Sequence, residues 1–96
     1  MTEVQFKGWK CRIKEGRYSN GRVALSLVDA ADGEPVAKAT VNLPDEPCGA
    51  DECFVKDHSE NSGMLSALEK AGIVKPTGSY VQSGFVRIPK CKLVGR

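Results

Sequence analysis

Hydrophobic and polar residues alternate along most of the first 43 positions, a pattern typical of strands with one buried and one solvated face. Val4 and Phe6 begin this pattern, and it continues through residues 9–14, 22–28 and 37–43. The Asn20-Gly21 pair between the first two long stretches is a strong hairpin signal, because both residues tolerate a positive φ. Asp32-Gly33 and the proline after it mark the next turn. The sequence therefore predicts a β-meander.

The second half of the chain predicts a short helix and a C-terminal hairpin. Residues 44–52 hold two prolines, a glycine and four acids, so we expect an irregular segment before a short strand at 53–56. The apolar residues Met64, Leu65, Leu68 and Ala71 share one helical face, with N-cap candidates at 59–62 and Gly72 as the terminating residue. Strands at 79–82 and 85–88 follow, with a bulge or break at Pro89.

These elements predict an α+β domain. We expect a small antiparallel sheet of about five or six strands, a β-meander plus a C-terminal hairpin, with one short helix packed on it. A chain of 96 residues has room for a single domain, residues 1–96. Its 41% hydrophobic and 27% charged residues exclude a collagen-like or wholly disordered chain. No apolar run approaches the ~20 residues of a membrane span, and no signal peptide is evident, so we expect a cytoplasmic protein.

Charge is strongly segregated along the chain. Residues 1–22 hold six cations and two acids (net +4), residues 45–60 hold six acids and one lysine (net −5), and residues 70–96 hold six cations and no acid (net +6). The folded surface could simply scatter these charges, or it could present opposed patches that steer a charged partner.

The acidic segment is one candidate partner-binding surface, because clustered carboxylates can occupy the basic, nucleic-acid-binding groove of another protein. Its acids are Asp45, Glu46, Asp51, Glu52, Asp57 and Glu60.

Three of the chain's ligand-type side chains are evenly spaced. Four residues separate Cys48 from Cys53, and four separate Cys53 from His58. Thiolates and imidazole suit a tetrahedral zinc ion, with Cys91 as the fourth ligand and Cys11, Asp51 or Asp57 as alternatives. A structural zinc is therefore one interpretation. In the other, Cys11 and Cys91 are small buried hydrophobic residues, and a disulfide is disfavoured in the cytosol.

Catalysis and nucleic-acid binding are two further possibilities. One histidine without an orienting partner, and no phosphate-binding glycine loop, favour a protein that is not an enzyme. Basic residues alternate along the first and last strands, which would suit nucleic acid, at positions Lys7, Lys10, Arg12, Lys14, Arg87, Lys90 and Lys92. The nearby Phe6 and Trp9 are expected in the core, because a domain with six aromatic residues needs most of them inside.

A set of segments spread over almost the whole chain forms a recognisable pattern. They are GWKC at 8–11, YSNGRVAL at 18–25, GEP at 33–35, ATVNLP at 39–44, VKDHSEN at 55–61, and Leu68, Gly72 and Thr77-Gly78. Together they resemble an uncharacterised family of small proteins carried by phages, plasmids and integrative elements. The family has no assigned chemistry that could be carried onto these residues.

The resemblance implies a protein of the host bacterial cytosol that counters host defences, with anti-CRISPR proteins as the prominent class of this size. We therefore expect a monomeric, non-enzymatic inhibitor that binds a Cas9-type CRISPR effector and blocks target-DNA loading or cleavage. The alternative is a small zinc-stabilised nucleic-acid-binding or regulatory protein of a mobile element.

Overall fold

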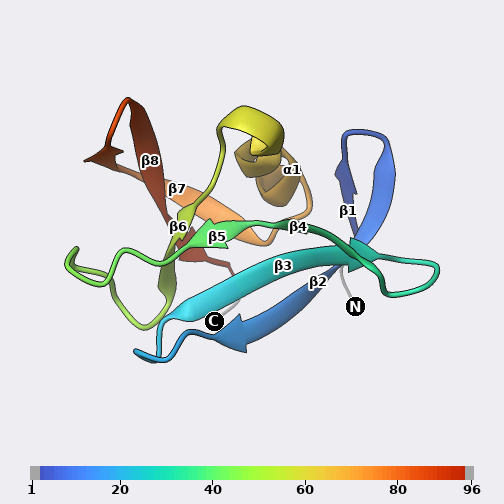
Figure 1. Cartoon of the computed structure of the whole chain (residues 1–96), viewed down its shortest axis with the longest axis horizontal. Coiled ribbons are helices and arrows are strands. Elements are labelled where there is room, and N and C mark those ends of the chain that lie inside the picture. Colours follow the sequence, from blue (N-terminus) through green and yellow to red (C-terminus); the bar gives the residue numbers. More distant parts are fainter. Residues whose placement is uncertain (1–2, 95–96) are drawn as a thin grey trace.

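The first forty residues fold into an antiparallel meander that opens with a short extra strand. The computed structural model describes residues 3–94. Its first sheet has the order β1 (Glu3–Phe6), β2 (Trp9–Arg17), β3 (Val23–Asp29) and β4 (Pro35–Lys38), as seen in Figure 1. The hairpin predicted at Asn20-Gly21 joins β2 to β3, and Gly21 adopts a φ of +84° there. The predicted meander is thus confirmed.

The prediction of one sheet with about five or six strands is wrong, because the chain forms two antiparallel sheets of four strands each. The second sheet has the order β5 (Thr40–Val41), β6 (Glu52–Val55), β8 (Val86–Leu93) and β7 (Val74–Ser83). The division falls at Ala39. Its N–H donates to the carbonyl of Leu25 in the first sheet (2.9 Å), while its own carbonyl accepts from the N–H of Lys56 beside β6 (2.9 Å). The strand predicted at 37–43 is therefore shared between the sheets.

The C-terminal hairpin is confirmed. Of the bulge or break predicted at Pro89, the break is wrong, and the bulge lies in the facing strand. β8 runs through Pro89, which pairs with Tyr80 of β7. The irregularity lies in the partner strand, between Pro76 and Tyr80, where Gly78 has a φ of +89°. A positive φ at a glycine is the ordinary way for a strand to absorb such a bulge.

The α-helix α1 (Met64–Lys70) follows a 3₁₀ turn, η1 (Ser59–Asn61), and is capped at both ends. Its N-cap is Gly63 rather than a residue within 59–62, because η1 occupies residues 59–61 and Ser62 is its C-cap. Asp57 supplies the missing acceptor: its Oδ1 accepts from the N–H groups of Gly63 (3.1 Å) and Leu65 (2.9 Å). Within residues 3–94, no helix is long and apolar enough to cross a membrane.

The helix ends at Gly72, as the sequence predicts. Gly72 has a φ of +74°, its N–H donates to Glu69, and the N–H of Ile73 donates to Leu68, which together form a Schellman motif.

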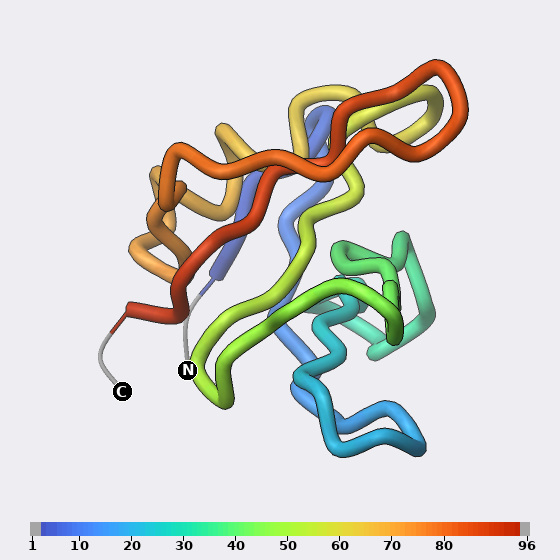
Figure 2. Tube along the Cα trace, turned by 90° about the vertical axis from the view of Figure 1, so that its left-hand side faces the viewer, coloured from blue at the N-terminus to red at the C-terminus, as the bar shows by residue number. Residues whose placement is uncertain are grey.

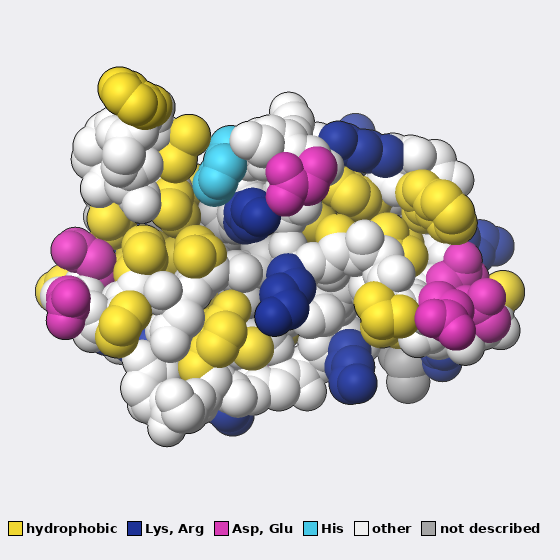
Figure 3. Space-filling view, viewed as in Figure 1, with side chains coloured by type: hydrophobic (Ala, Val, Ile, Leu, Met, Phe, Trp, Pro, Cys, Tyr) yellow, Lys and Arg dark blue, Asp and Glu magenta, His cyan; other side chains and the backbone are white. Residues whose placement is uncertain are grey.

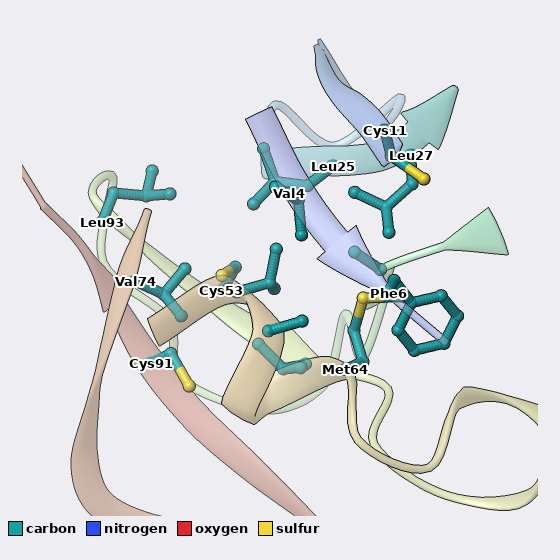
Figure 4. Packing of buried hydrophobic residues seen from close by; sticks show 14 of the residues in the cluster. Val4, Phe6, Cys11, Leu25, Leu27, Cys53, Met64, Val74, Cys91 and Leu93 are labelled. Carbon is teal, nitrogen blue, oxygen red and sulfur yellow. The ribbon is translucent and has the colours of Figure 1, made fainter. Parts of the chain in front are cut away.

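The hydrophobic core lies where α1 and the two sheets meet. Figure 2 shows the two sheets after a turn of 90°. Figure 4 shows side chains from both sheets and from α1 converging on one cluster. Its fully buried members include Val4, Leu25, Leu27, Met64 and Leu68. Because Met64 and Leu68 have no exposed surface, the apolar face of α1 is part of this core and is not free to bind a second copy.

Candidate functional site

Three of the four cysteines belong to the hydrophobic core. Cys11, Cys53 and Cys91 are buried, and Cys53 and Cys91 lie opposite each other in the β6–β8 pair (Figure 4). Burial raises the pKa of the Cys53 and Cys91 thiols to about 12, and it also raises the pKa of Cys11. These thiols are therefore protonated at neutral pH and behave as small apolar groups.

Of the four residues predicted to bind zinc, Cys53 and Cys91 face each other in the β6–β8 pair, and Cys48 is close enough to raise the pKa of Cys53, whereas His58 lies elsewhere. Cys48 is half-buried, and its Sγ donates to the carbonyl of Glu52 (3.2 Å). His58 lines a surface hollow with Tyr18, whereas Cys53 and Cys91 lie in the core. Within residues 3–94, no group of three or more His, Cys, Asp or Glu side chains is placed to hold a metal ion. The zinc site therefore stays a prediction.

Four of the six acids predicted to bind a partner have contacts within the chain. Asp51 and Glu52 pair with the β8 lysines Lys92 (3.5 Å) and Lys90 (3.9 Å). Asp57 caps α1 as described above. The hydrogen bond from Lys56 (2.9 Å) to Glu60 lowers the pKa of that carboxyl group. Four of these six carboxylates therefore already have a partner within the chain.

Asp45 and Glu46 are the acids of this segment that have no side-chain partner among residues 3–94. They lie in a turn whose start is fixed by Arg22, which donates from its guanidinium to the carbonyls of Leu43 and Pro44. Asp45 is exposed and Glu46 is half-buried. The pair remains available to a partner.

A hollow of about 460 Å³ lies between the β1–β2 turn, β4 and η1. Its apolar walls are Phe6, Trp9, Val36 and Ala37. Three lysines also line it: Lys7, Lys38 and Lys56. We call it the tryptophan hollow. Its volume falls in the range of about 300–1,000 Å³ that is usual for ligand sites.

A second hollow of about 380 Å³ adjoins the first and shares Lys38 and Lys56 with it. It also contains Tyr18 and His58, and we call it the histidine hollow. A third, of about 380 Å³, extends from Lys38 to Lys14 along the β3–β4 side of the first sheet. Lys38 thus belongs to all three hollows. In the part of the chain that the structure describes, the one carboxylate lining any of them is that of Glu60.

Figure 3 shows the face of the molecule seen in Figure 1. Lys and Arg side chains are spread through its middle, with hydrophobic side chains between them, and acidic side chains gather mainly toward its two ends. The β4–β5 junction, which carries Lys38, crosses the middle of the same view in Figure 1. We call the surface formed by Lys7, Lys14, Lys38 and Lys56 the lysine face.

The sequence did not predict that Trp9 lies at the surface beside the lysine face. Phe6 is buried as expected, but Trp9 is 54% exposed, so the prediction that it lies in the core is wrong. Trp9 is the first residue of β2 and pairs with the last residue of β1. It therefore projects beyond the end of the packed sheet. The Lys7-Gly8 turn, with both residues at positive φ, was the available signal for this position.

The basic residues predicted on the last strand are differently placed. Lys90 and Lys92 pair with acids, and the guanidinium of Arg87 lies 4.5 Å from the centre of the exposed Tyr80 ring. By contrast, Lys38, which the sequence marked only as the polar position of a strand, has no side-chain partner among residues 3–94. Lys38 thus differs from Lys90 and Lys92, because it lines the hollows without a paired acid among residues 3–94.

Comparison with protein-family models, with curated protein sequences and with solved structures gave no match.

Proposed function

We propose that this protein binds nucleic acid through the lysine face. The observation that carries the proposal is that two adjoining hollows share Lys38 and Lys56. Lys7 and Lys14 extend the line of cations on either side of Lys38. A concave surface of this kind favours a linear polyanion over an isolated phosphate, because each lysine can meet a different phosphate along the strand.

The charge balance of the hollows supports the same ligand. Glu60 is held by Lys56, and Lys7 donates from its Nζ to the backbone carbonyl of Glu60 (2.7 Å). Glu60 is therefore neutralised where it lines the tryptophan hollow, and Lys38 and Lys14 remain to attract phosphates. Neutralising phosphates releases counterions, so we expect binding that weakens steeply with salt.

The test is a titration of fluorescently labelled oligonucleotide, followed by anisotropy at low salt. Lys38→Ala removes a phosphate contact, so it should weaken binding to all sequences and reduce the salt slope by about one. Lys75→Ala is the matched control, because Lys75 is an exposed lysine of β7 outside all three hollows. Absence of binding at low salt, or equal losses in the two variants, would refute the proposal.

A second candidate function is inhibition of a Cas9-type CRISPR effector by direct contact. The resemblance to a family of mobile-element proteins favours it, and Asp45 and Glu46 offer unpartnered carboxylates for the effector's basic groove. Under this proposal the protein blocks loading of target DNA without binding DNA itself.

The two candidates separate in one pair of titrations. In the first, the protein is titrated into a mixture of a Cas9-type effector and its labelled target DNA, and binding of the effector to the DNA is measured. In the second, the protein is titrated into the labelled DNA alone. Inhibition without DNA affinity, abolished in Asp45→Asn/Glu46→Gln, supports the effector inhibitor. DNA affinity that depends on Lys38 and persists in that double variant supports the nucleic-acid-binding protein.

A further inference from the structure

We infer that the tryptophan hollow is a pocket for one unpaired nucleobase stacked on Trp9, so that the ligand class is single-stranded nucleic acid. The inference rests on the proposed function. It adds a substrate class and a recognition element that charge alone does not give.

Trp9 presents an aromatic surface at the wall of a hollow rather than on a convex surface. It pairs with Phe6, and directly paired residues of an antiparallel ladder project to the same side. That side is the core side, where Phe6 is only 5% exposed, yet Trp9 remains 54% exposed. The indole thus extends the apolar surface of the core outward to solvent, with space beside it that no side chain of residues 3–94 fills.

The rest of the hollow matches the other parts of a nucleotide. Val36 and Ala37 add apolar wall, which suits the face and edge of a base. Lys7 is held in place by the carbonyl of Glu60 and by the Phe6 ring, whose centre is 5.5 Å from its Nζ. Among residues 3–94, Lys38 has no side-chain partner that would draw it away from the hollow. A nucleotide within a strand fits this arrangement, because its flat base can contact the apolar walls and its flanking phosphates can contact Lys7 and Lys38.

The hollow discriminates between single and double strands. A base can enter it only after leaving the stack, which in a duplex requires unpairing at a cost of a few kcal/mol. In a single strand the base is already free to stack on an aromatic side chain, and base stacking of this kind is largely independent of sequence. We therefore expect a preference for single strands over duplexes, with little preference among sequences.

The experiment uses the fluorescence of Trp9 itself, which is the chain's single tryptophan. The full-length protein is titrated with three probes: oligothymidylate of ten nucleotides, oligouridylate of ten nucleotides, and the oligothymidylate annealed to oligoadenylate. Stacking predicts quenching of Trp9 emission by both single strands, with the duplex binding at least several-fold more weakly. The two single-stranded probes separate DNA from RNA as the preferred ligand.

Three variants test the pocket by anisotropy with the same oligothymidylate. Trp9→Ala should lower affinity roughly 10-fold or more, since stacking contributes about that factor per base, whereas Trp9→Phe should retain most of it. Phe85→Ala is the control, because Phe85 is a fully exposed aromatic residue (104%) outside the hollows. Circular dichroism confirms that each variant is folded.

The outcomes distinguish this inference from the proposed function. Equal affinity for single strand and duplex, with unchanged Trp9 emission and full affinity in Trp9→Ala, overturns the base pocket while Lys38-dependent binding still stands. Quenching by an acidic peptide containing tyrosine, but not by either single-stranded oligonucleotide, overturns both and assigns the hollow to a protein ligand. The absence of binding by every nucleic acid also overturns both.

Discussion

Asp57 is expected to stabilise the fold rather than bind a partner. Its contribution to the free energy of unfolding can be worked out from its contacts. Its Oδ1 accepts from two N–H groups at the start of α1, those of Gly63 (3.1 Å) and Leu65 (2.9 Å). Asp57→Ala leaves both donors without that acceptor. Loss of a capping side chain costs about 0.5–2 kcal/mol, and the carboxylate makes these bonds charge-assisted, so we expect a loss of about 1–2 kcal/mol in unfolding free energy.

The assay is urea denaturation followed by far-UV circular dichroism, with Trp9 emission as a second probe. In thermal melts the same loss lowers the midpoint by about 4–8 °C for each kcal/mol. Asp57→Asn keeps an acceptor without the charge, so it should fall between wild type and Asp57→Ala. Asp45→Ala is the control, because Asp45 is exposed and has no side-chain partner among residues 3–94, so its loss should change stability by less than about 0.5 kcal/mol. Equal stabilities of the two alanine variants would refute the capping role.

Three further predictions concern pH, metal and salt. The pKa of Cys53 and Cys91 is about 12 in the folded chain against 9.0 for a free thiol, so the unfolded state loses protons first above pH 9. Stability should be intact below pH 9 and fall as the pH rises toward 12, and a urea midpoint that does not change between pH 8.5 and 10.5 would contradict this. EDTA should leave the melting temperature unchanged, whereas stoichiometric zinc together with a lower melting temperature in EDTA would show that a metal site forms. The four cations of the lysine face predict a slope of about −2 to −3 for log affinity against log salt with single strands, and a slope near zero would exclude phosphate contacts.

Local signals predicted most of the secondary structure. The hairpin at Asn20-Gly21 and the helix end at Gly72 were correct, because a positive φ at glycine and a short run of helical periodicity are encoded by neighbouring residues. The division into two sheets was not predictable. It depends on Ala39, which bonds to Leu25 on one side and to Lys56 on the other. Such pairing is set by distant residues, and the alternation of apolar positions continues unchanged through it.

The candidate site was predicted less well than the fold. Even spacing suggested a zinc site at Cys48, Cys53 and His58, but β6 directs Cys53 into the core while His58 lies beyond the end of that strand. The sequence identified the acidic residues of the 45–60 segment. It does not show which of their carboxylates are neutralised by lysines of another strand. The sequence did not single out Lys38 either, because the three hollows that this residue lines exist only after folding.

The most direct test of the lysine face is a two-dimensional ¹H–¹⁵N NMR titration of the protein with single-stranded oligothymidylate at low salt. The account predicts fast, saturable shifts centred on Lys38, Lys56 and the Trp9 indole N–H, which disappear in Lys38→Glu and persist in Lys75→Glu. Shifts confined to the 45–52 segment or to the β7–β8 hairpin, or no shifts at all, would contradict it.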